Sequence, residues 1–172
     1  WGGEFFRWRK SEFSRIAHLQ YFPILFGDKM AREPRLSALA IAPIEDRYLL
    51  EGKFTPQEWK VYLAALQTES IKTSSMGRLF DAVACCCGFC NKATYEGEAA
   101  LLLEEAAKDF LQSQKADYFN PYLFEFGDET IDTSFLIAQV LNDVRQCIFS
   151  NEIAARFHWT LVQLIRDVAH RA

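Results

Sequence analysis

Four of the chain's five cysteines crowd together between residues 85 and 90, and cysteine thiolates are common ligands of structural zinc. A structural zinc site needs four ligands, and Cys87-x-x-Cys90 supplies only one ligand pair. Cys147 and the three histidines are scattered along the sequence. We therefore expect no metal site in this chain. Cys85, Cys86 and Cys87 are expected to fill packing positions of a helix as small apolar side chains.

Asp81 lies within the apolar stretch LFDAVA, where a carboxylate in a helix must either face solvent or be paired. Two interpretations remain open. The ordinary one is a solvated helix face. The functional one is a carboxylate directed into a cleft, where its two oxygens can accept hydrogen bonds from both hydroxyls of a ribose.

Two other segments have residue types suited to nucleotide or anion binding. Gly97 precedes an Ala/Leu/Glu-rich segment, where it is either an ordinary N-cap or a point at which a nucleotide can approach the backbone. Lys29 and Arg32 lie at a predicted helix start, where they are either surface charge or an anion site. His158 is expected to be a packed, hydrogen-bonded residue and not a catalyst. The sequence pattern assigns no catalytic residue.

The composition is that of one folded domain, with 172 residues, 50% of them hydrophobic, and 15 phenylalanines. The net charge of -4 gives no electrostatic reason to bind nucleic acid. No apolar run approaches the roughly 20 residues that span a bilayer, and no signal peptide is visible. Crowded, odd-numbered cysteines favour the reducing cytoplasm. The start at Trp1 suggests a piece of a longer protein, although a processed or trimmed N-terminus would look the same.

Hydrophobic patterning predicts strands over residues 4–9 and 15–25. Asp28 is expected to cap a helix that runs to about Ala42, with Pro34 kinking it or delaying its start.

Thr55-Pro56-Gln57-Glu58 predicts a helix that opens with a capping box. The remaining predicted elements are a helix from Ser74 or Ser75 to Gly88, a helix over 97–114, an extended segment over 122–126, a helix from Asp132 or Thr133 to about Cys147 and a helix from Ser150 to Ala169. The last helix is expected to bury a stripe formed by Ile153, Phe157, Leu161, Leu164 and Val168. The predicted class is α+β, mostly helical, with a small N-terminal β portion.

Six motifs, taken in chain order, resemble the C-terminal half of the HypF carbamoyltransferases, which mature nickel-iron hydrogenases. The motifs are WGGEFF, RIAHLQYFPI, GDKMAREPR, TSSMGRLFDAVA, TYEGEAALLLEEAA and ARFHWTL. The resemblance spans almost the whole chain, and TSSMGRLFDAVA followed by TYEGEAA is its most specific part.

The resemblance implies that residues 1–172 form one partial transferase domain, a fragment of an actin-like, ribonuclease H-like nucleotide-binding fold related to the tRNA threonylcarbamoyltransferases. It implies that the parent protein uses carbamoyl phosphate and ATP to form carbamoyl-adenylate. The carbamoyl group then passes to the C-terminal cysteine of a HypE-type acceptor protein. Asp81 matches the family aspartate that holds the ribose, and Gly97 matches the glycine beside the nucleoside. Lys29 and Arg32 match a basic helix start.

The family's metal ligands and its adenylate-forming domain match nothing in this chain. We therefore expect the metal ion to belong to the full-length parent and the isolated chain to be inactive. Two alternatives remain open. One is an O-carbamoyltransferase that acts on a small-molecule hydroxyl. The other is a helical interaction module without nucleotide chemistry, in which Asp81 and Gly97 would lie apart.

Overall fold

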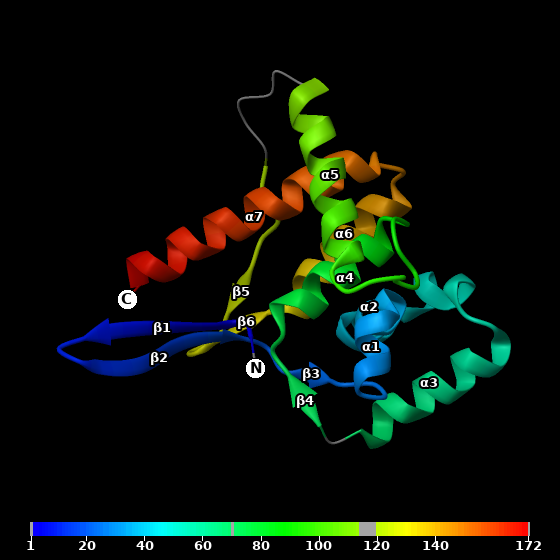
Figure 1. Ribbon diagram of the computed structural model, residues 1–172, viewed down its shortest axis with the longest axis horizontal. Helices are drawn as coiled ribbons and strands as arrows, with labels where there is room; N and C mark the ends of the chain where they lie inside the picture. The colour runs from blue at the N-terminus through cyan, green and yellow to red at the C-terminus, as the bar shows by residue number, and fades with distance from the viewer. Residues whose placement is uncertain (1, 70, 114–119, 172) are drawn as a thin grey trace.

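The computed structural model describes residues 2–69, 71–113 and 120–171, and it is mostly helical with a β-sheet on one side (Figure 1). The α-helices are α1 (Asp28–Arg32), α2 (Pro34–Ile41), α3 (Pro56–Thr68), α4 (Met76–Cys86), α5 (Glu98–Ser113), α6 (Thr133–Arg145) and α7 (Ser150–Arg171), and a 3₁₀ helix covers Ile44–Lys53. The strands are β1 (Glu4–Arg9), β2 (Glu12–Leu19), β3 (Phe22–Pro23), β4 (Lys72–Thr73), β5 (Glu125–Phe126) and β6 (Thr130–Asp132). The predicted α+β, mostly helical class is confirmed. Within the described ranges, no helix is long and apolar enough to cross a membrane.

The main sheet has the strand order β1-β2-β6-β5, so the N-terminal hairpin is completed by strands from much later in the chain. Strand β2 pairs antiparallel with β1 and parallel with β6. The predicted strand over 4–9 is confirmed, but the second strand begins earlier than predicted and ends at Leu19. Lys10 and Ser11 make the tight turn between them with φ values of 50° and 68°. Neither residue type is typical of such a turn, so the pattern contained no turn signal.

The helix predicted from Asp28 to about Ala42, with Pro34 kinking it or delaying its start, is interrupted at Pro34 and forms two helices, α1 and α2. Pro34 begins α2, and Glu33 before it is extended, with φ -122° and ψ 83°. A proline disfavours helical backbone in the preceding residue, which explains the break. The predicted cap was one residue late, because Gly27 is the N-cap with φ 56° and Asp28 is already helical.

The predicted capping box of α3 is confirmed, since Thr55 and Glu58 exchange side-chain and backbone hydrogen bonds. Glu58 also accepts a 2.6 Å hydrogen bond from Arg35, whose side chain is buried. Arg35 further binds Glu33 at 2.6 Å and the Lys53 carbonyl at 2.8 Å. One guanidinium therefore joins α2, the 3₁₀ helix and the start of α3.

Helix α2 is buried along its whole length and packs against α4, while α5 packs against α7. Ser75 caps α4 by accepting from the Arg78 amide, and Gly88 follows the helix with φ 84°, as predicted. The stripe predicted for the last helix is buried as expected, and it comprises Ile153, Phe157, Leu161, Leu164 and Val168. Helix α4 also packs against α5 and α6, so neighbours on several sides fix its side chains.

Candidate functional site

Asp81 lies in α4 with only 5% of its surface exposed, which excludes the solvated helix face. Its Oδ2 atom lies 2.9 Å from Nη1 of Arg78, one turn earlier on the same helix. The side chain is therefore buried and paired. Arg78 is a site residue that was not predicted, although its i,i+3 spacing from Asp81 is a readable signal.

Burial raises the pKa of the Asp81 carboxyl to about 6, and the Arg78 guanidinium opposes this by favouring the charged form. The two atoms lie at ion-pair distance but are poorly aligned. Among the described residues, neither Asp81 Oδ2 nor Arg78 Nη1 has a well-oriented hydrogen-bond partner. A buried acceptor in this state retains the capacity to bind a hydroxyl donor.

An open pocket of about 290 Å³ lies between the start of α4 and the start of α1. Arg78 and Ser75 line it from α4, and Gly27, Asp28 and Ala31 line it from α1. Asp81 itself does not line this pocket, but its partner Arg78 does. The ion pair therefore connects the buried carboxylate to an accessible space.

Gly97 immediately precedes α5, and its carbonyl accepts the hydrogen bond of the Leu101 amide at 3.0 Å. Its φ of 83° is a conformation that favours glycine, and a Cβ built there would meet nothing within 4 Å. Glu98 holds this turn by accepting from the amide and the hydroxyl of Thr94. The helix start is thus ordered and open on the side where a side chain would project.

The loop between α4 and α5 is hydrogen-bonded to the end of α1. The Ala93 amide donates to the Arg32 carbonyl at 2.8 Å, which ties the loop to the end of α1. Burial raises the pKa of the Cys90 thiol, and the carboxylates of Glu98 and Asp81 raise it further.

The two basic residues predicted at α1 differ in their surroundings. Lys29 donates a 2.8 Å hydrogen bond to the Tyr62 hydroxyl and lies 5.1 Å from the centre of that ring. Arg32 is exposed, and its side chain has no hydrogen bond or ion pair with the residues that the structure describes. Of the two, only Arg32 keeps its charge uncommitted.

The cysteines near the end of α4 are free and buried, as their predicted packing role requires. Burial raises the pKa of the Cys85 and Cys87 thiols to about 12 in each case. Such thiols are protonated near neutral pH and are poor nucleophiles and poor metal ligands. In the part of the chain that the structure describes, no group of three or more His, Cys, Asp or Glu side chains could hold a metal ion.

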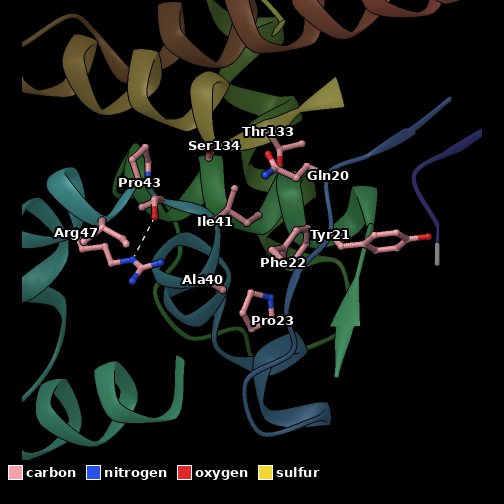
Figure 2. Close-up of a pocket in the computed structure, with 12 residues that line it drawn as sticks. Gln20, Tyr21, Phe22, Pro23, Ala40, Ile41, Pro43, Arg47, Thr133 and Ser134 are labelled. Carbon is pink, nitrogen blue, oxygen red and sulfur yellow. Dashed lines mark hydrogen bonds between the residues drawn. The ribbon is translucent and has the colours of Figure 1, made fainter. Parts of the chain in front are cut away.

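A second pocket, of about 190 Å³, lies where the 3₁₀ helix, the end of α2 and the start of α6 meet (Figure 2). Its one charged lining residue is Arg47, which donates to the Ala42 carbonyl at 3.2 Å. Burial lowers the pKa of Arg47. No residue predicted for the site lines this pocket, and we place the candidate site at α4 instead.

Comparison with known proteins gives a family match over residues 1–172, to the model described as "Carbamoyltransferase, Kae1-like Domain, second subdomain". Carbamoyltransferase HypF of Synechocystis sp. is 30% identical over 200 residues, which cover 99% of this chain and 24% of the relative. Carbamoyltransferase HypF of Rhodobacter capsulatus is 39% identical over 116 residues, covering 63% of this chain and 15% of the relative. The chain therefore spans a quarter or less of these relatives' length.

A solved structure is also similar to this fold. It is the crystal structure of full-length HypF in the phosphate- and nucleotide-bound form, which matches with a TM-score of 0.80 and 27% identity. The match covers 92% of this chain and 21% of the solved chain.

Proposed function

The chain belongs to the HypF family of carbamoyltransferases, and from this premise we propose that it forms the nucleoside-binding wall of such an enzyme. In this proposal residues 1–172 are one partial transferase domain. The complete protein passes a carbamoyl group from carbamoyl phosphate, through carbamoyl-adenylate, to the C-terminal cysteine of a HypE-type acceptor protein.

The observation that carries the proposal is the state of Asp81. A buried carboxylate normally has its hydrogen-bonding capacity used by neighbours, yet Oδ2 of Asp81 has only a poorly aligned guanidinium beside it. We propose that this carboxylate accepts both ribose hydroxyls of the nucleotide. Arg78, which lines the open pocket, then holds Asp81 in the ionised form that can accept them.

Gly97 is proposed to lie beside the nucleoside. The open space at its Cα and its positive φ support this role, because a side chain there would block a close approach. Arg32 is the better candidate of the two basic residues for a phosphate or carbamate oxygen, since Lys29 is engaged with Tyr62. The nucleotide and phosphate bound to the solved HypF relative support a nucleotide as ligand.

These residues would position the nucleotide and take no covalent part in the reaction. In the transfer step a thiolate attacks the carbamoyl carbon and AMP leaves. Binding energy at the nucleoside holds the reacting carbon in place for that attack. The described residues do not provide a metal site, so any ion would be bound by other parts of the complete protein. We therefore expect the isolated chain to be inactive.

The test is AMP release by the complete protein with a HypE-type acceptor. Asp81→Asn should lower the rate at least about tenfold, because each charge-assisted hydrogen bond contributes roughly 1.5–3 kcal/mol and about 1.4 kcal/mol is one decade. Glu105→Gln, an exposed carboxylate on α5, is the matched control and should keep the parent rate. Parent-level activity in a folded Asp81→Asn protein would remove Asp81 from the site.

A further inference from the structure

The pocket of about 190 Å³ in Figure 2 is separate from the candidate site at α4, and none of its lining residues lines the pocket beside Arg78. Four parts of the fold meet in it. The lining includes Gln20 and Phe22 from the end of β2 and from β3, Ile41 from α2, Arg47 from the 3₁₀ helix and Thr133 from the start of α6.

Arg47 is a half-buried cation whose charge is not balanced by a neighbouring carboxylate. Its Nε atom donates to the Ala42 carbonyl at the end of α2, an interaction that leaves the other guanidinium nitrogens unused. In the part of the chain that the structure describes, Nη1 and Nη2 have no hydrogen-bond or ion-pair partner, although both remain accessible. Burial disfavours the charged form and lowers the pKa of Arg47, with only Glu45 opposing this effect. An anion bound at the two Nη atoms would offset that cost.

The far end of the pocket carries an unpaired hydroxyl. Figure 2 shows Gln20 and Thr133 at the end away from Arg47. Thr133 is only 2% exposed, and among the described residues its hydroxyl has no hydrogen-bond partner, yet it is not sealed off from the pocket. Buried hydroxyls are normally paired, so a free one that lines a pocket is suited to a polar group of a ligand.

The rest of the lining limits what such a ligand can be. Phe22 and Ile41 give the pocket an apolar wall between its two polar ends. Asp132 precedes Thr133 in the chain, and its carboxylate caps α6 by accepting from backbone amides of the first turn. This charge disfavours a second anion at the Thr133 end, whereas a neutral hydroxyl is compatible with it.

We propose that this pocket binds a small organic acid with a single carboxylate. The carboxylate pairs with Nη1 and Nη2 of Arg47 in a bidentate arrangement. The apolar body of the acid lies against Phe22 and Ile41, and a hydroxyl at its far end bonds with Thr133. The site goes beyond the proposed nucleotide site and does not depend on what Asp81 binds.

The test is a titration of the complete protein with para-hydroxybenzoate, followed by saturation-transfer NMR of the ligand. This acid carries its carboxylate and its hydroxyl at opposite ends of a flat apolar ring. Arg47→Gln should weaken its binding at least about tenfold, because charge-assisted hydrogen bonds are the strong ones. Arg9→Gln removes an exposed arginine from β1 and is the control that should bind like the parent. Equal affinity in the parent and Arg47→Gln would overturn the proposal.

The ligand can be varied as well as the protein. In the parent, para-hydroxybenzamide, which has the same shape without the charge, should bind at least about tenfold more weakly than the acid. This comparison decides the matter even where circular dichroism shows that Arg47→Gln does not fold, because equal binding of acid and amide would overturn the proposal. Terephthalate, which replaces the hydroxyl with a second carboxylate, should also bind more weakly than para-hydroxybenzoate.

Thr133→Val tests the far end of the pocket. The parent should prefer para-hydroxybenzoate to benzoate, and the variant should bind the two equally. A preference that persists in the variant would contradict the proposed binding mode. The absence of saturable binding of para-hydroxybenzoate by the parent would show that the pocket is closed in the complete protein or binds water alone, and it would overturn the proposal.

Discussion

Asp81 is a carboxylate that the fold buries at a cost in stability. Its pKa of about 6, against an ordinary value of 3.8, means that the folded state holds the Asp81 proton more tightly than the unfolded state does. The stabilising effect of that proton is complete below 3.8 and is lost as the pH rises through about 6. Near neutral pH the ionised group therefore costs roughly 3 kcal/mol, at about 1.36 kcal/mol per pKa unit. Such a cost is typical of functional positions.

Asp81→Asn should remove this pH dependence, because the amide does not titrate. We expect the free energy of unfolding of the parent to fall by roughly 3 kcal/mol relative to the variant as the pH rises from 3.8 to beyond about 6. Urea denaturation followed by circular dichroism across this range measures the difference. Asp109→Asn, which removes an exposed carboxylate from α5, is the matched control and should follow the parent. Parallel curves for parent and Asp81→Asn would show that burial does not perturb this carboxyl.

At the scale of elements, the features that local chemistry decides were predictable. The capping box at Thr55 and Glu58, the break at Pro34 and the end of α4 before Gly88 each depend on residues close in sequence. Contacts between distant segments were not predictable. Glu58 also binds Arg35, 23 residues away, and no local pattern encodes that distance.

The sheet and the site also combine local features, which were predictable, with long-range contacts, which were not. β6 pairs with β2 across more than half the chain, and the turn at Lys10 and Ser11 uses residue types that rarely adopt positive φ. Asp81 could be singled out because a carboxylate interrupts an apolar helix. The pocket between α1 and α4 could not, because it exists only once both helices pack.

Arg35 should be the main clamp between α2 and α3. Removing one partner from a buried ion pair leaves uncompensated charges, and Arg35→Met is expected to lower the free energy of unfolding by about 3 kcal/mol. At this chain length that corresponds to a fall in Tm of roughly 6–12 °C, which calorimetry can measure. Arg166→Met breaks an exposed pair with Asp167 and should cost no more than about 1 kcal/mol. Similar losses in the two variants would contradict the clamp.

At the scale of the whole molecule, we propose that the fold forms one wall of a nucleotide-binding cleft. The starts of α4 and α1 line one open pocket, and the foot of β1 lies against Ser74 and Ser75 beside it. The loop before α5 is hydrogen-bonded to Arg32 at the end of α1. A wall of this kind binds a nucleotide fully only when the opposite wall is in place. Nucleotide binding by Asp81 is therefore best measured in the complete protein.

The most direct test is a double-mutant cycle that combines Asp81→Asn with removal of the ribose hydroxyls. Calorimetric titration would compare ATP with its dideoxy analogue, which lacks both hydroxyls, for the complete parent and the complete variant. If Asp81 accepts both hydroxyls, the analogue binds the parent at least about tenfold more weakly than ATP does, and the variant binds the two nucleotides equally. The same loss of affinity for the analogue in parent and variant would show that Asp81 does not contact the ribose, and it would contradict the account.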